Sequence, residues 1–188
     1  MAADEADELR GIHKVATAFS RAIGVDDPVL ADQIALAMYD DRFSYHVFPE
    51  VYEALGRVKA SGRLSMGIVS NWQPSILPLC RFLKLDSFFD FILGSCSVGS
   101  VKPGRAIFLK ALALSGARAD EAIHVGDDLI QDVMGAKRLG IAPVWLIREN
   151  TALISSSCEP PAPIIRDLTG LFSLDLKAFR AIRWSHQA

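Results

Sequence analysis

The first part of the chain alternates apolar and polar positions at the spacing of an α-helix. Apolar side chains recur on one face, at Leu9, Ile12, Ala16, Phe19 and Ile23. This spacing predicts an amphipathic helix that ends at Gly24, where a left-handed residue is favoured. Asp27 and Pro28 then supply an N-cap and a first-turn proline for a second helix. We therefore expect residues 1–47 to be helical.

From residue 49 onward the pattern switches between helices and short, fully apolar strands. A helix from Pro49 to Gly62 precedes an apolar strand at 64–69. The same order recurs with helices near 74–83, 104–115 and 130–139 and strands at 89–93, 122–125 and 143–147, followed by a weaker strand at 163–166 and a last helix up to Trp184. Helices alternating with apolar strands predict a parallel sheet with helices on both faces. The fold class is α/β.

Composition and charge narrow the range of partners. The 188 residues are 51% hydrophobic and 22% charged, which is typical of a globular protein with one sizeable core. Twenty Lys and Arg against 22 Asp and Glu leave a net charge of -2, which predicts no nucleic-acid or anionic-membrane partner. No apolar run approaches the roughly 20 residues that a membrane-spanning helix needs.

The cysteines and the first residues bear on location. Cys80, Cys96 and Cys158 are widely spaced and odd in number, which favours a reducing compartment and hence a cytoplasmic protein. Residues 1–11 are rich in acids, unlike a secretory signal or an organelle transit peptide.

Polar residues follow the first two predicted strands, where ligands of open parallel sheets collect. Ser70 and Asn71 end the first strand with a hydroxyl, an amide and backbone N–H groups that could hold an anion. The same pair is also common as a turn or helix cap. Lys102 lies just before Pro103 and a helix start, and a solvated surface lysine is the alternative interpretation.

Three acids follow the third strand. Asp127 and Asp128 lie at its end, and Asp132 is in the first turn of the next helix. Carboxylates there can simply cap the helix, but three in six residues also resemble a site for a hard cation such as Mg²⁺. His124, inside the strand, is expected to be a core or cross-strand residue.

Taken together, Ser70-Asn71, Lys102-Pro103 and the run GDDLIQD at 126–132 resemble the haloacid dehalogenase-like (HAD) superfamily, in its helical-cap phosphatase-like branch. The resemblance covers about residues 9–170. It implies a Rossmann-like parallel sheet with flanking helices, divided into a partial helical cap at 1–47, an α/β core at 48–176 and a C-terminal helix end and tail at 177–188.

The resemblance also implies roles for individual residues. Ser70 corresponds to the phosphate-binding hydroxyl, with Asn71 beside it supporting the substrate-binding loop. Lys102 corresponds to the catalytic lysine that neutralises charge on the nucleophile and the phosphoryl group. Asp127 corresponds to a magnesium ligand, and Asp132 to the downstream acid that supports the metal site. The implied cofactor is Mg²⁺, and the implied substrate is a small phosphorylated metabolite.

The family's first motif, DxDxT, is absent from these residues. Its two aspartates are the nucleophile and the general acid of the family's phosphomonoester hydrolysis, which proceeds through an aspartyl-phosphate. The nearest echo is PIIRDLTGLF at 163–172, where Asp167 has no second acid two residues later. We therefore expect negligible phosphatase turnover from this chain alone.

The missing motif also has a structural consequence, because the family's central first strand carries it. The two flanking strands must then pair with each other, recruit another segment, or be completed by a protein partner or a second copy. An N-terminal truncation is the favoured explanation. The main alternative is a non-catalytic scaffold or regulatory pseudoenzyme that binds a partner. A metal-free dehalogenase and a receiver domain fit less well.

Overall fold

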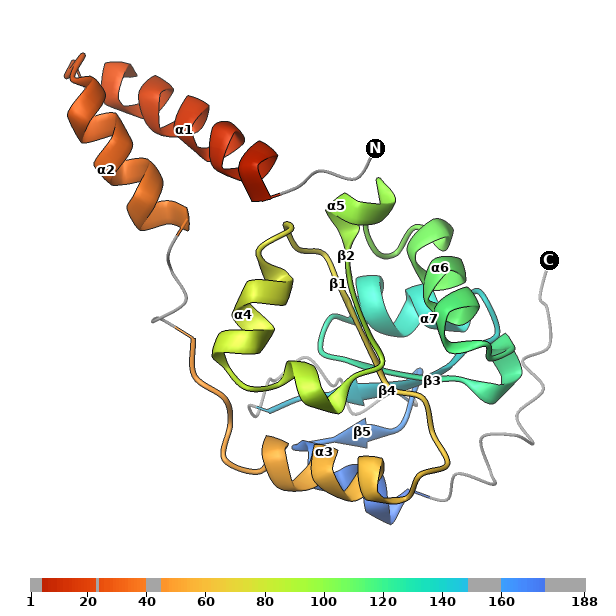
Figure 1. Cartoon of the computed structure of the whole chain (residues 1–188). Helices are drawn as coiled ribbons and strands as arrows, with labels where there is room; N and C mark the ends of the chain where they lie inside the picture. The colour runs from red at the N-terminus through yellow and green to blue at the C-terminus, as the bar shows by residue number, and fades with distance from the viewer. Residues whose placement is uncertain (1–4, 23, 40–44, 149–159, 175–188) are drawn as a thin grey trace.

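The protein is described by a computed structural model that covers residues 5–22, 24–39, 45–148 and 160–174. It confirms a mixed α/β fold with parallel strands and flanking helices, as the apolar pattern predicted. Figure 1 shows an N-terminal helical hairpin that stands off from a larger α/β body. In the described part of the chain, no helix is long and apolar enough to span a membrane.

The hairpin consists of α1 (Glu5–Ala22) and α2 (Pro28–Tyr39). Gly24 takes a φ of +81°, which ends α1 as its position predicted. The Asp27 carboxylate accepts a hydrogen bond from the Val29 N–H at 2.9 Å and so caps α2. The two helices pack through buried Ala16 and Ala31, small side chains that let their backbones approach closely.

The strands form two separate parallel sheets. In the first, β1 (Gly67–Ser70) pairs with β2 (Phe91–Gly94). In the second, the order is β3 (Ile123–Gly126), β4 (Ala142–Leu146) and β5 (Ile164–Ile165). All pairs are parallel, so the carboxyl ends within each sheet share an edge.

One edge of β1 and one edge of β3 carry no strand partner within the described residues. The strands β1 and β3 therefore do not pair with each other, and no described segment lies between them as a strand. Two of the three arrangements expected from the sequence are thus not seen in this part of the chain. Completion by a second chain stays a proposal.

Helices cover the sheets on several sides (Figure 1). They are α3 (Val51–Ala60), α4 (Ile76–Phe82), α5 (Ser95–Val98), α6 (Arg105–Ser115), η4 (Leu129–Met134), α7 (Gly135–Lys137) and the 3₁₀ segments η2 (Asp86–Phe88), η3 (Ala119–Glu121) and η5 (Leu168–Ser173). The main core joins Leu93 of β2 to Ile107 and Phe108 of α6 and to Ala136 of α7. A second cluster around Val133 and Trp145 seals η4 against the β3–β4–β5 sheet.

Two sequence predictions differ from the structure, and a third lies outside the residues that it describes. The helix expected at 130–139 is a π-helical turn, η4, followed by the short α7. The first strand begins at Gly67 rather than at residue 64. The last helix, expected up to Trp184, and the boundary of the predicted C-terminal tail lie outside the described residues.

Candidate functional site

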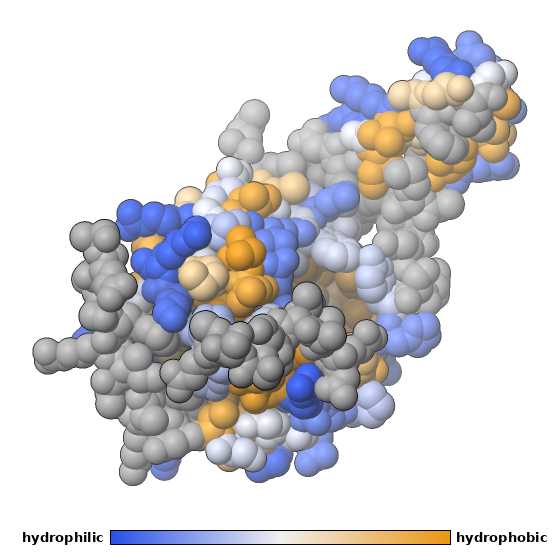
Figure 2. Space-filling view, turned by 180° about the vertical axis from the view of Figure 1, so that it is seen from behind, coloured by the Kyte–Doolittle hydropathy of each residue, from blue (hydrophilic) through white to orange (hydrophobic). Residues whose placement is uncertain are grey.

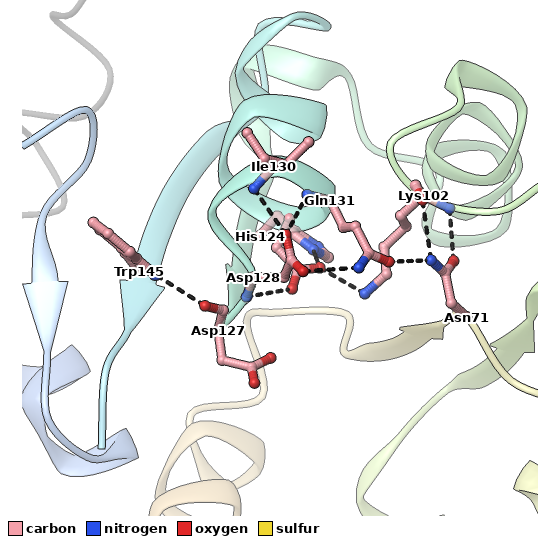
Figure 3. Close-up of polar contacts among 9 residues, drawn as sticks. Asn71, Lys102, His124, Asp127, Asp128, Ile130, Gln131 and Trp145 are labelled. Atoms are coloured by element: carbon pink, nitrogen blue, oxygen red, sulfur yellow. Dashed lines mark hydrogen bonds and ion pairs between the residues drawn. The ribbon is translucent and has the colours of Figure 1, made fainter. Parts of the chain in front are cut away.

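Residues from both sheets meet at the carboxyl ends of β1 and β3 (Figure 3). Asn71 follows β1, Lys102 lies between α5 and α6, and Asp132 belongs to η4, which follows β3. The structure brings these three predicted residues together through direct hydrogen bonds. Asn71, Lys102 and Asp132 therefore form one hydrogen-bonded group at the carboxyl ends of the strands.

Lys102 and Asp132 form a buried ion pair at the centre of this group. The Lys102 Nζ donates to Asp132 Oδ1 at 2.5 Å, and their side chains are only 12% and 5% exposed. His124 Nε2 lies 2.9 Å from the same oxygen. Burial alone would raise the pKa of Asp132, but the hydrogen bonds and charges of His124 and Lys102 outweigh it and lower the pKa to about 2. The carboxylate is therefore ionised and paired with the lysine.

Gly126 makes room for this carboxylate. A Cβ at Gly126 would lie 2.2 Å from Asp132 Cγ, closer than any stable contact. Asp132 Oδ2 turns to the Asp128 N–H at 3.2 Å, while Oδ1 takes Lys102 and His124. Both oxygens of Asp132 thus accept hydrogen bonds from the chain itself, and the carboxylate holds the Lys102 ammonium.

Asn71 holds the backbone of Lys102 from the other sheet. Its Oδ1 accepts from the Lys102 N–H at 2.6 Å, and its Nδ2 donates to the Lys102 carbonyl at 3.0 Å. The second Nδ2 hydrogen goes to Gln131 Oε1. Both amide hydrogens and the amide oxygen of Asn71 are thus used within the chain and hold the backbone at Lys102, and the predicted substrate-binding role of Asn71 stays a prediction.

Asp128 and Gln131 extend the network along η4. The Asp128 carboxylate accepts from the backbone N–H groups of Gln131 at 2.7 Å and Ile130 at 2.8 Å, and Gln131 Nε2 donates to it at 2.8 Å. The backbone hydrogen bond from Gln131 is the largest influence on the Asp128 carboxyl and lowers its pKa. Asp128 therefore caps the helix, which was its alternative interpretation in the sequence.

Ser70 and Asp127 differ from their neighbours, because their side chains make no hydrogen bond or ion pair with other described residues. The Asp127 backbone carbonyl is fixed by the Trp145 Nε1–H at 2.9 Å, while its side chain is exposed. Figure 3 shows the Asp127 carboxylate directed away from His124 and Gln131. Each strand end thus combines side chains that are hydrogen-bonded within the described residues with one that is not.

Asp127 offers one hard ligand for a divalent metal. Among the described residues, no group of three or more metal-binding side chains gathers. Asp132 Oδ1 is taken by Lys102 and His124, and Oδ2 accepts one hydrogen bond from the Asp128 N–H, so the role of Asp132 in supporting a metal stays a prediction. The Asp127 carboxylate is a suitable hard ligand, and Mg²⁺ is commonly held by one or two carboxylates together with substrate phosphate and water.

Asp167, the weak echo of the missing motif, lies elsewhere. Its carboxylate caps η5 by accepting from the N–H groups of Thr169 at 2.8 Å and Gly170 at 3.2 Å. The hydroxyl of Thr169 also donates to it and lowers the pKa of Asp167. It follows β5, two strands away from β3 in the sheet order, so it caps a helix far from Lys102 along the sheet.

Sequence reasoning missed two residues of this network. His124 was expected in the core or across the strand, and its ring does stack edge-on against Phe108 at 5.2 Å, but Nε2 also reaches Asp132. A signal was present, because His124 and Gly126 have the same orientation along a period-two strand that ends at the site. Gln131 precedes Asp132 directly, and a regular α-helix would have turned the two side chains apart by about 100°.

The chain is similar to known proteins of one hydrolase family. The profile of the haloacid dehalogenase-like hydrolase family matches residues 9–146. The chain is 33% identical over 124 residues to haloacid dehalogenase-like hydrolase domain-containing protein 3 of Xenopus laevis, covering 64% of this chain and 50% of that protein. It is 35% identical over 116 residues to the glyceraldehyde 3-phosphate phosphatase of Pyrococcus furiosus, covering 58% and 46%.

Among solved structures, a HAD phosphatase from Thermococcus onnurineus has a TM-score of 0.66 at 22% identity, covering 86% of each chain. This likeness shows the fold. The chain spans about half the length of the curated relatives it matches.

Proposed function

The chain belongs to the haloacid dehalogenase-like hydrolase family, and from that premise we propose that it carries the anion-binding and cation-binding part of a site for phosphomonoester hydrolysis. The observation that supports this most is the arrangement at the two strand ends. A fixed ammonium group, Lys102, lies with the uncommitted hydroxyl of Ser70 and the uncommitted carboxylate of Asp127 at the ends of neighbouring parallel sheets. Phosphate recognition requires such a combination of positive charge and hydrogen-bond donors.

Each residue has a distinct part in the proposed chemistry. Ser70 donates its hydroxyl to a phosphoryl oxygen, and the Lys102 ammonium balances the negative charge that builds up on the phosphoryl group. Asp132, which is itself hydrogen-bonded by His124, holds the Lys102 ammonium in place. Asp127 would hold Mg²⁺, which when bound neutralises phosphate charge and orients the phosphoryl group.

The attacking carboxylate has to come from outside the residues described above. None of the acids in the network is free to attack, because Asp128 and Asp132 are held by the chain and Asp127 is reserved for the cation. We propose that a strand from a partner chain that carries the missing motif lies between β1 and β3 and brings an aspartate beside Lys102. Without that strand, the chain should not turn over phosphomonoesters.

The substrate is proposed to be a small phosphorylated metabolite. The Pyrococcus relative is named for a phosphatase acting on glyceraldehyde 3-phosphate, a molecule of this kind. A non-catalytic, partner-binding role is the alternative, and the unpaired edges of β1 and β3 favour it equally well. The two functions predict different results when the strand is supplied. The first predicts hydrolysis of phosphomonoesters, and the second predicts binding without hydrolysis.

Hydrolysis of p-nitrophenyl phosphate in Mg²⁺ separates them. The assay compares the chain alone, the chain with an apolar strand peptide that ends in DxDGT, and the chain with a matched peptide in which both aspartates are replaced by asparagine. We expect turnover only with the aspartate peptide, and none when Lys102→Met replaces the wild-type chain. Stoichiometric binding of both peptides without turnover would support the partner-binding role. Turnover by the chain alone at the same rate would contradict the proposal.

A further inference from the structure

We infer that Gln131 is a positioning residue for Lys102, acting through Asn71. This inference rests on the proposed function for its consequence, because Lys102 matters as the cation of the phosphate site. The structure supports it by a continuous run of hydrogen bonds from the Asp128 carboxylate through the Gln131 and Asn71 amides to the Lys102 backbone. Among the described residues, Asp128 is the one charged side chain that the Gln131 amide contacts by a hydrogen bond.

The direction of every hydrogen bond in this run is determined by its ends. The Asp128 carboxylate only accepts, so the Gln131 group facing it must be the NH₂, and Oε1 must face Asn71. The Lys102 N–H only donates, so the Asn71 group facing it must be Oδ1, and Nδ2 must face Gln131. The two amides therefore meet donor to acceptor in the only consistent arrangement.

Two neighbouring residues of η4, Gln131 and Asp132, therefore hold Lys102 at two points. Its ammonium is bound by Asp132, and its backbone is bound by Asn71, which Gln131 holds. Gln131 and Asp132 are neighbours in the π-helical turn η4, and both side chains reach the site. Because β1 and β3 do not pair as strands, the Gln131–Asn71 contact joins the two sheets at this edge.

Loss of the Gln131 amide should therefore loosen the backbone of Lys102 in particular. In Gln131→Met, which keeps the length of the side chain, Asn71 Nδ2 loses its second acceptor and Asp128 loses a donor. Asn71 can then rotate away from the Lys102 N–H. Asp128→Asn should act in the same way from farther off. Its NH₂ would force the Gln131 amide to turn over and present a donor to the Asn71 donor.

Amide hydrogen exchange by NMR tests this directly in the full chain, with no ligand present. We expect the Lys102 N–H to exchange about fivefold to tenfold faster in Gln131→Met and in Asp128→Asn, as loss of one ordinary hydrogen bond predicts. The amides of Val144 in β4 should keep their rates. Gln33→Met, the same change at an exposed position of α2, is the matched control and should alter neither.

Inorganic phosphate binding in Mg²⁺ supplies the functional readout. Gln131→Met should weaken phosphate binding severalfold in the wild-type background and have no further effect in a Lys102→Met background, because it acts through that lysine. A uniform rise of exchange across β4, an unchanged Lys102 amide, or equal effects of Gln131→Met in both backgrounds would overturn the inference. If the wild-type chain binds no phosphate, the proposed function fails, and the exchange rates still decide the role of Gln131.

Discussion

Each of the two parts of the molecule contains an aspartate–histidine pair, and the two pairs differ in their surroundings. His13 of α1 and Asp32 of α2 join the hairpin with side chains that are 47% and 60% exposed. His124 and Asp132 join β3 to η4 with side chains that are 14% and 5% exposed, and Lys102 completes the group. The same chemistry is thus a surface link in one region and the centre of a buried network in the other.

The other side chains of the two regions also differ in burial and in polar contacts. The hairpin packs through Ala16 and Ala31 and leaves large apolar side chains in solvent, with Val15 56% and Val29 61% exposed. Figure 2 shows such hydrophobic residues on the surface of the hairpin. At the strand ends, by contrast, polar groups meet in matched donors and acceptors. Apolar spacing therefore specifies the hairpin, whereas polar complementarity specifies the site.

Replacing the aspartate of each pair by alanine should give the largest difference between the two regions in the free energy of unfolding. Asp132→Ala leaves Lys102 buried without its counter-charge and should lower the free energy of unfolding by about 3–5 kcal/mol. Asp32→Ala breaks an exposed pair and should cost less than about 1 kcal/mol. Urea unfolding followed by circular dichroism measures both. Equal losses for the two variants would show that the Asp132 network carries no special stability.

Acid should weaken the stabilising effect of the network around Asp132. The pKa of Asp132 is lowered to about 2 in the folded chain, so its stabilising effect is present above the unfolded pKa and is lost as pH falls towards 2. Between pH 6 and pH 2, the wild-type chain should lose about 2 kcal/mol more unfolding free energy than Asp132→Asn, which has no carboxyl to protonate there. Parallel acid profiles for the two chains would contradict this assignment.

A destabilising substitution in the hairpin should affect the stability of the hairpin alone. Ala16→Leu places extra methylenes where no space exists, at a residue that is 0% exposed, and should destabilise the hairpin by about 1–3 kcal/mol. Because α1 and α2 contact chiefly each other, amide exchange should quicken in both helices and remain unchanged in β3 and β4. Faster exchange in β3 would show that the two regions unfold together.

The smallest effect on stability is expected at Asp127. Its carboxylate makes no hydrogen bond or ion pair with other described residues, so Asp127→Asn should change the free energy of unfolding by less than about 0.5 kcal/mol. Thermal unfolding measures this, with Asp132→Asn as the contrasting variant. A loss comparable to that of Asp132→Asn would mean that Asp127 is structural and not reserved for a ligand.

The sequence predicted the parts of this fold that depend on local pattern. Gly24 and Asp27 mark the hairpin turn, and apolar runs mark the parallel strands, because these signals act over a few residues. The position of Asn71, Lys102 and Asp132 followed from motifs at the strand ends. The separation of the sheets and the Gln131–Asn71 contact depend on residues 60 positions apart, and no local pattern encodes such a contact.

Titration of inorganic phosphate into the chain by isothermal calorimetry, in Mg²⁺, tests the central claim most directly. We predict saturable binding that weakens at least about tenfold in Lys102→Met, since a hydrogen bond to a charged group contributes roughly 1.5–3 kcal/mol. Asp127→Asn should abolish the dependence of that binding on Mg²⁺. Binding of equal strength in the wild-type and Lys102→Met chains, or none in the wild type, would contradict a phosphate site at these strand ends.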